Sequence, residues 1–153
     1  MSKIITKGLI IVLITVGVFV GIETTPAQEI PVFKKLSQVE QWKEYLKDEL
    51  FEKEKTYQDF VIMEAIVFCE SGWGQYYENG EVKVSKGNIG LAQINRLAHH
   101  EEYRQLGLDP YDPLNNLSYA AILYDKNGVR DWEKWSGACW KPILAEKGIV
   151  FNN

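Results

Sequence analysis

The sequence predicts a mainly α-helical domain with one small loop or hairpin insert, preceded by a separate N-terminal segment. Apolar side chains recur at three- and four-residue spacing along most of the chain, which is the period of a helix face. A polar stretch interrupts that spacing between residues 75 and 89. The chain has 153 residues and a net charge of −4, so it is sized for one domain and has no basic run that would favour nucleic acid as a partner.

The N-terminal segment has the pattern of an export signal. Lys3 and Lys7 precede residues 8–22, an apolar run without charge, and small residues suited to cleavage follow. Two interpretations stay open: residues 1–27 are a cleaved signal peptide, or residues 8–22 remain as an inner-membrane anchor. Both predict that residues 28–153 form one domain exported to the periplasm or cell envelope.

Two helices are expected in the first half of this domain. Over residues 36–50, apolar residues keep the spacing of one helix face, with Lys and Glu between them. Residues 57–70 are apolar nearly all round from Phe60, so they are expected to form the central and most buried helix. Gly72 and Gly74 are expected to end it.

The insert follows. Asn79-Gly80 is a turn signal and residues 81–84 alternate like a short strand, which together favour a small hairpin. Residues 88–95 are then expected to lead into another helix, which continues through Leu97 to about residue 106.

Two further helices are expected in the second half. Asp112-Pro113 suits the start of a helix over residues 114–126, and Asn127-Gly128 suits its end. Residues 129–140 carry three tryptophans and are expected to be rich in loops. A short final helix is expected at residues 141–147.

The chain has two cysteines, Cys69 and Cys139. In an exported protein they are candidates for a disulfide, which would stabilise the fold by roughly 4 kcal/mol in the chain-entropy model. Two separate buried thiols are the alternative, and the sequence does not decide between them.

Glu70 stands at the end of the most apolar helix. Apolar neighbours disfavour the ionised form of a carboxyl and raise its pKa. A carboxylic acid that stays protonated near neutral pH can protonate a glycosidic oxygen. Glu70 is therefore a candidate general acid.

Glu70 belongs to a series of three short motifs. They are Glu70-Ser71-Gly72, residues 90–95 (GLAQIN), and Asp112-Pro113 with Asn116-Leu117. In order and spacing they resemble the soluble lytic transglycosylases (SLT type) of the lysozyme-like superfamily, and the resemblance covers residues 57–140. It implies a lysozyme-like helical fold and cleavage of the β-1,4 bond between N-acetylmuramic acid and N-acetylglucosamine in peptidoglycan. We expect a monomer, and we expect no cofactor or metal because no metal-binding or phosphate-binding motif appears in the sequence.

The resemblance also implies roles for single residues. Glu70 becomes the catalytic acid and base, and Ser71 orients it or a sugar N-acetyl group. Gly90 and Gln93 line the cleft floor, and Asn95 is a further candidate for binding the glycan. Structural roles stay open beside these: an unusual loop dihedral for Gly90, and capping of the next helix for Gln93 and Asn95.

One departure from the family concerns the second carboxylate. Asn88 stands where animal lysozymes carry an aspartate in a similar stretch. A retaining two-carboxylate mechanism needs a second acid about 5 Å away, and the acids nearby in the sequence are Glu78 and Glu81. The single-acid mechanism is therefore preferred, in which Glu70 protonates the leaving oxygen and then deprotonates the muramic C6 hydroxyl as it closes onto C1. Its product is a 1,6-anhydro sugar.

A second departure is the absence of the family's A-Y-N motif, whose tyrosine contacts the catalytic glutamate. Trp132 or Trp135 from the equivalent region, or Tyr119 or Tyr124 from the preceding helix, are the candidates to replace it. The sequence leaves this choice open.

Aromatic residues after Glu70 suit stacking on sugar rings. Trp73, Tyr76 and Tyr77 are candidates for this, with loop packing on the core as the alternative for each. His99 and His100 are adjacent and cannot share a helix face, so a solvated face is expected for them rather than a metal site.

These features predict an exported enzyme that cleaves peptidoglycan glycan strands, most simply a lytic transglycosylase. A lysozyme-like hydrolase on the same fold is one alternative, and a non-catalytic wall-binding or scaffold protein is another. By analogy alone, a small domain of this kind would open the wall for a secretion, conjugation or phage-entry machine.

Overall fold

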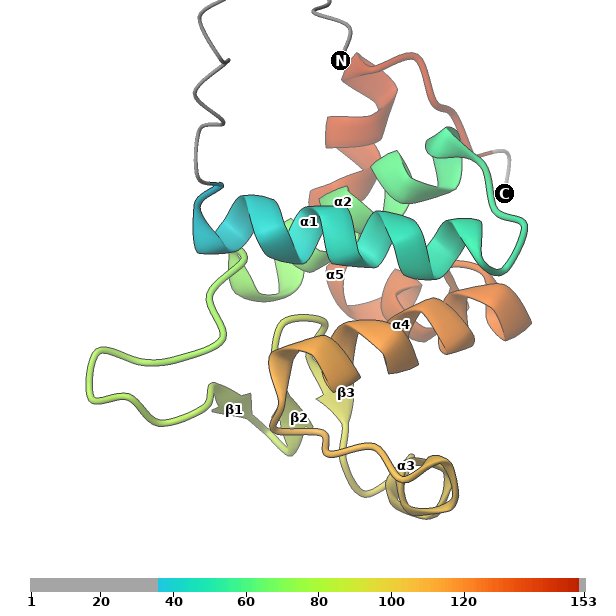
Figure 1. The fold of residues 1–153 in the computed structure, drawn as a ribbon. Coiled ribbons are helices and arrows are strands. Elements are labelled where there is room, and N and C mark those ends of the chain that lie inside the picture. Colours follow the sequence, from blue (N-terminus) through green and yellow to red (C-terminus); the bar gives the residue numbers. More distant parts are fainter. Residues whose placement is uncertain (1–35, 152–153) are drawn as a thin grey trace, which may run out of the picture. The chain divides into compact units, whose positions relative to one another are not determined.

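A computed structural model describes residues 36–151. Within them lie five helices, α1 (Gln38–Phe51), α2 (Tyr57–Ser71), α3 (His100–Leu106), α4 (Pro113–Asn127) and α5 (Arg130–Glu146), and three strands, β1 (Val84–Ser85), β2 (Asn88–Ile89) and β3 (Ile94–Asn95) (Figure 1). The strands form one antiparallel sheet in the order β1-β2-β3. The predicted mainly α-helical class with a small insert is confirmed. The predicted export segment, residues 1–27, lies outside the described residues.

The first two helices begin at capping boxes. Ser37 and Thr56 each accept a hydrogen bond from the backbone N–H of the third helical residue, and the carboxylate of that residue accepts one from the backbone N–H of the cap. Gly72 ends α2 in the left-handed conformation, with φ of 63°. Both helices fall where the sequence predicts them, and α2 contributes the largest run of buried apolar side chains: Phe60, Ile62, Met63, Ala65, Ile66 and Val67.

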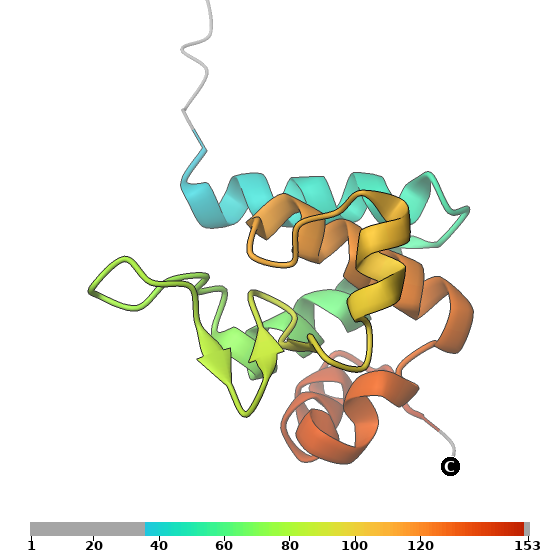
Figure 2. The same ribbon diagram turned by 90° about the horizontal axis from the view of Figure 1, so that it is seen from below.

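The fourth helix also follows its prediction. Asp112 accepts a hydrogen bond from the Asn115 N–H at 2.8 Å, Pro113 is its first residue, and Gly128 ends it. In space α1 packs against α4 and α2 packs against α5, so the core lies between these two pairs (Figures 1 and 2).

The expectation of loops over residues 129–140 is wrong, because α5 is one continuous helix from Arg130 to Glu146. The reason is a stripe of buried residues at four-residue spacing, Trp132, Ser136, Trp140 and Leu144, that packs on α2. Pro142 lies inside the helix, and the packing of this stripe compensates for the destabilisation that a proline causes there.

The expectation that residues 88–95 lead directly into a helix is also wrong. They form strands β2 and β3, and α3 begins only at His100. The turn between the two strands needs positive φ at Gly90 (77°) and Gln93 (47°), which a helix does not allow. The turn predicted at Asn79-Gly80 is present, since the Tyr77 N–H donates to the Glu81 carbonyl at 2.8 Å and Tyr76 pairs with Val82.

A disulfide joins Cys69 of α2 to Cys139 of α5, with 5.9 Å between their Cα atoms. The sequence left open whether these cysteines form a disulfide or remain two separate thiols, and the structure has the disulfide. No helix within residues 36–151 is both long enough and apolar enough to cross a membrane.

Candidate active site

A cavity of about 270 Å³ opens beside the end of α2 and contains Glu70. The sheet and the first turns of α5 flank it, and these elements lie near each other in the view from below (Figure 2). Two tryptophans, two carboxyls and several amides share its surface: Glu70, Lys86, Asn88, Gln93, Ile94, Asn95, His99, Leu123, Asp131, Trp132 and Trp135. Such a mixture of flat apolar rings and hydrogen-bonding groups suits a carbohydrate ligand.

Glu70 is half-buried, and this burial raises the pKa of its carboxyl above the usual range. The nearby hydroxyl of Ser136 in α5, which donates to the Trp132 carbonyl at 3.2 Å, opposes part of this rise in pKa. Glu70 therefore holds its proton to higher pH than an exposed glutamate does, which is the property that a general acid needs. Ser136 lies in the region predicted to replace the A-Y-N tyrosine, although neither tryptophan of that region is the partner.

The helical wall of the cavity consists of α2 and α5, which the Cys69–Cys139 disulfide links one residue before Glu70. Trp132 is buried and its indole N–H donates to the Ala92 carbonyl at 2.9 Å, so this ring is fixed between α5 and the sheet. Trp135 is 76% exposed and lies at the rim. Trp132 thus closes the wall, whereas Trp135, which has the Lys134 ammonium 4.7 Å from its ring centroid, is exposed to solvent at the rim.

The β wall consists of the strands and the turn between β2 and β3. Asn116 of α4 is fully buried beneath that turn, where its side chain accepts from the Ala92 N–H at 2.9 Å and donates to the Ile89 carbonyl at 3.0 Å. Gly90 packs so closely on Asn116 that a Cβ at this position would lie 2.7 Å from the amide carbon. Gly90 therefore has the structural role and does not line the cavity.

Three of the predicted binding residues do line the cavity: Gln93, Asn95 and Trp135. The Gln93 amide nitrogen donates to the Gly90 carbonyl at 2.8 Å, which holds the side chain against its own turn. Asn95 accepts from the Ala98 N–H at 3.0 Å and so caps a turn ahead of α3 rather than the helix itself.

The predicted residues directly after Glu70 lie outside the cavity. The Ser71 hydroxyl donates to the Val67 carbonyl within α2 at 3.2 Å. Tyr76 and Tyr77 are exposed on the loop before β1, and the Tyr77 hydroxyl donates to the Val84 carbonyl at 3.2 Å. Trp73 is buried in the core, so it packs against the core rather than stacking on a sugar ring.

Neither tyrosine of α4 has Glu70 as its hydrogen-bond partner. The Tyr119 hydroxyl bonds Glu102 and lies 3.0 Å from the His99 ring nitrogen, while the Tyr124 hydroxyl donates to Asp59 at 2.7 Å. The solvated helix face expected for His99 is thus wrong, because this ring precedes α3 and lines the cavity. Within residues 36–151, no group of three or more His, Cys, Asp or Glu side chains is placed to hold a metal ion.

The second carboxylate in the cavity is Asp131, which the sequence analysis missed. Glu78 and Glu81, the acids named there, are exposed on the loop before β1 and do not line the cavity. Asp131 lies in the first turn of α5 and accepts from the Asn127 side-chain amide at 2.9 Å. The signal was the four-residue spacing of Asp131 and Trp135, which places both on one helix face once the segment is recognised as a helix.

Comparison of the chain with known proteins gives no match. No protein-family model, no curated protein and no solved structure matches it.

Proposed function

We propose that this protein is an exported peptidoglycan-cleaving enzyme with a lysozyme-like domain, and that it acts as a lytic transglycosylase with Glu70 as its single catalytic acid and base. The observation that carries the proposal is the position of Glu70. It is a half-buried carboxyl with a raised pKa, on the surface of a cavity that also offers an exposed tryptophan and several amides.

The residue of β2 that lines this cavity supports the single-acid reaction. Asn88 lines the same cavity as Glu70 and stands at the sequence position where animal lysozymes carry an aspartate, and an amide cannot serve as the nucleophile of a retaining enzyme. In the proposed reaction Glu70 gives its proton to the glycosidic oxygen as the bond to C1 breaks. The resulting carboxylate then removes the proton of the muramic C6 hydroxyl, whose oxygen bonds to C1. No water is consumed, and Glu70 is again protonated at the end.

Asp131 favours a second candidate function on the same site. A carboxylate that shares the cavity with the acid can hold a water molecule on the other face of the sugar, as inverting glycosidases do. In that case the product would be a reducing sugar and the protein would be a hydrolase. The two functions differ in their products and in their dependence on Asp131.

Mass spectrometry of digested peptidoglycan tests both functions. Purified wall is incubated with the protein, with Glu70→Gln and with Asp131→Asn. We expect 1,6-anhydromuropeptides from the unaltered protein and from Asp131→Asn, and a loss of at least about a hundredfold in Glu70→Gln, which is the usual contribution of a general acid.

Each other outcome has a definite meaning. Reducing-end muropeptides that disappear in Asp131→Asn would replace the transglycosylase with the hydrolase. Equal activity of Glu70→Gln and the unaltered protein would refute the role of Glu70. Binding to the wall without any release of fragments would favour a non-catalytic wall-binding protein.

A further inference from the structure

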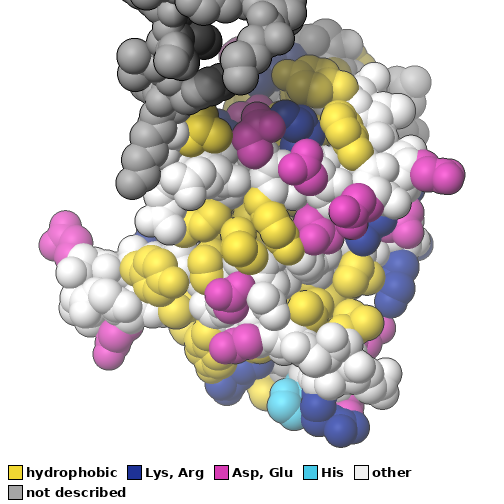
Figure 3. Space-filling model, in the orientation of Figure 1, with side chains coloured by type: hydrophobic (Ala, Val, Ile, Leu, Met, Phe, Trp, Pro, Cys, Tyr) yellow, Lys and Arg dark blue, Asp and Glu magenta, His cyan; other side chains and the backbone are white. Residues whose placement is uncertain are grey.

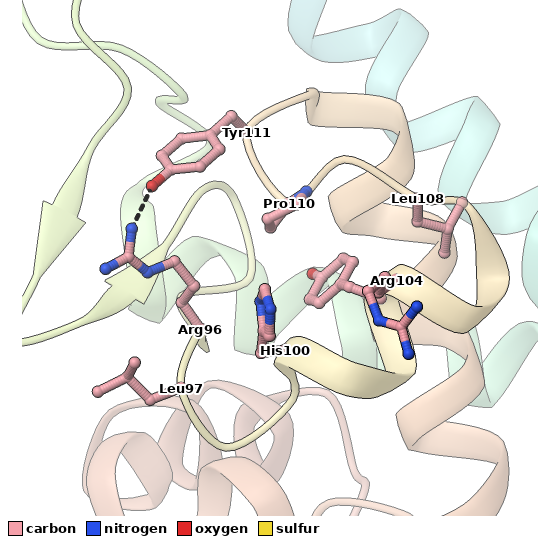
Figure 4. Close-up of a pocket in the computed structure, with 8 residues that line it drawn as sticks. Arg96, Leu97, His100, Arg104, Leu108, Pro110 and Tyr111 are labelled. Atoms are coloured by element: carbon pink, nitrogen blue, oxygen red, sulfur yellow. Dashed lines mark hydrogen bonds between the residues drawn. The ribbon is translucent and has the colours of Figure 1, made fainter.

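A second and larger cavity, of about 520 Å³, lies between the start of α3 and the chain that leads into α4 (Figure 4). Its volume is within the range of sites that bind small ligands. Both cationic and apolar side chains line it, chiefly Arg96, Leu97, His100, Leu108, Pro110 and Tyr111. Nothing in the proposed cleavage reaction uses these residues.

The arginines of this cavity differ in their state of pairing. Arg104 lies 2.9 Å from the Glu101 carboxylate, which compensates its charge. Arg96 instead donates to the Tyr111 hydroxyl at 2.7 Å, and within residues 36–151 it has no ion pair with a carboxylate. In Figure 4 these two arginines lie on either side of His100. Arg96 therefore carries the uncompensated positive charge of the cavity, with donors left to bind an anion.

Hydrogen bonds within the protein hold the wall that carries Arg96 in place. The buried Gln75 donates from its amide to the Tyr111 carbonyl at 2.8 Å, and the Tyr111 N–H donates to the Asp109 carboxylate at 2.9 Å. These bonds fix the loop that carries Tyr111, and Tyr111 in turn fixes the guanidinium of Arg96. A preformed cation loses little freedom when it binds its partner.

The two cavities share one segment of chain. Asn95 and His99 line the cavity of Glu70, whereas Arg96, Leu97 and His100 line the second cavity. A polymer bound along the first cavity can therefore send a side branch into the second. In peptidoglycan the muramic acid carries such a branch, a short peptide with carboxylates and small apolar side chains.

We propose that the second cavity binds the acidic peptide stem of the substrate, with Arg96 on a stem carboxylate and the apolar residues on its alanyl side chains. This inference rests on the proposed function, because it takes the same polymer as ligand. Charge complementarity supports it. The protein as a whole is acidic, with a net charge of −4, yet a histidine and basic side chains gather at the α3 end of the molecule (Figure 3).

Binding of a stem fragment tests the proposal. The probe is N-acetyl-L-alanyl-γ-D-glutamate, whose acetyl group stands for the lactyl amide, and the control probe is its uncharged diamide. Kd is measured by isothermal titration calorimetry on Glu70→Gln, so that catalysis plays no part. We expect the acidic probe to bind more tightly than the diamide.

Two matched variants, Arg96→Gln and Arg104→Gln, are made in the Glu70→Gln background and remove one positive charge each. We expect Arg96→Gln to weaken binding about tenfold, as the loss of a charge-assisted hydrogen bond does. Arg104→Gln should change Kd by no more than about twofold, because Glu101 already compensates its charge. Equal unfolding midpoints of the two variants establish that both are folded.

The proposal is overturned if the acidic probe does not bind, if the diamide binds equally well, or if Arg96→Gln binds as before. These results are separable from the fate of the proposed function. If the protein cleaves the wall but does not bind the probe, only the proposed peptide-binding site is refuted, and the proposed function stands. If the probe binds in a way that depends on Arg96 but the protein does not cleave the wall, the proposed enzymatic function is refuted and the peptide-binding site is retained.

Discussion

The two walls of the candidate cleft are stabilised by different interactions. The helical wall, α2 and α5, is held by a stripe of buried apolar and aromatic side chains and by the Cys69–Cys139 disulfide. The β wall has short strands of two residues each, and two buried side chains anchor it by hydrogen bonds: Asn116 to Ala92 and Ile89, and Trp132 to Ala92. The acid Glu70 lies on the first wall, and the amides of Asn88 and Gln93 lie on the second.

This difference separates two requirements of the site. The helical wall supplies the low-polarity surroundings that raise the pKa of Glu70, and apolar packing tolerates substitutions that conserve volume. The β wall sets the positions of polar groups, and each of its hydrogen bonds is needed because an unpaired buried group is costly. Changes to the helical wall should therefore act mainly on stability, whereas changes to the β wall should also displace the groups that face the ligand.

Breaking the disulfide has the largest expected effect on the helical wall. The double variant Cys69→Ser with Cys139→Ser removes a crosslink between residues 70 positions apart. In the chain-entropy model this lowers the free energy of unfolding by roughly 4 kcal/mol, which urea unfolding measures. Reduction of the unaltered protein is the control and should give the same shift. An unchanged midpoint in both would mean that packing alone holds this wall.

A methyl group at Gly90 tests the β wall. Gly90→Ala places a Cβ 2.7 Å from the Asn116 amide carbon at a positive φ, so we expect a loss of about 3 kcal/mol from strain and overpacking together. Gly87→Ala is the matched control, because Gly87 has a similar φ of 84° but open space around its Cβ position. It should lose only about 1 kcal/mol. Equal losses would show that the contact with Asn116 is unimportant.

The smallest expected effect is the dependence of stability on the charge of Glu70. Its pKa in the folded protein is raised above the ordinary value of 4.5, so the folded state binds more protons than the unfolded state just above that pH. The contribution of Glu70 is present below pH 4.5 and is lost as pH rises through the raised pKa. Glu70→Gln has no such loss and should be more stable than the unaltered protein above that pKa.

Thermal unfolding across pH measures this difference, and Glu78→Gln on the exposed loop is the control. We expect Glu78→Gln to follow the unaltered protein at every pH. A difference between Glu70→Gln and the unaltered protein that does not vary with pH would mean that the desolvated charge is not its cause. The claim that the helical wall acts on Glu70 through its low-polarity surroundings would then be wrong.

The helical wall could be predicted from sequence only in part. The apolar run of α2, the capping residues Ser37 and Thr56, and Gly72 as a helix end are local signals, because each acts through neighbours a few residues away. The same kind of signal was present in α5, where Trp132, Ser136 and Trp140 are four residues apart. The loop expectation for residues 129–140 noted the three tryptophans of this stretch and overlooked this four-residue spacing.

The β wall could not be predicted from local pattern. The turn that contains Gln93 is hydrogen-bonded through Ala92 and Ile89 to Asn116, which follows Gln93 by more than twenty positions. The same applies to Ser136 beside Glu70 and to Asp131 in the cavity, since both come from a helix distant in sequence. Tyr76 and Tyr77 follow Glu70 closely in sequence and yet lie outside its cavity.

Local sequence patterns are sufficient to predict the mainly helical class, the ends of three helices and the carboxyl at the end of the central helix. These depend on hydrophobic period and capping, which act over a few residues. Three features follow from the folded arrangement alone. The cysteines are joined, Asp131 rather than Glu78 or Glu81 lines the cavity, and Arg96 has no carboxylate partner within residues 36–151. Distances between residues far apart in the chain set all three, and a local pattern does not encode those distances.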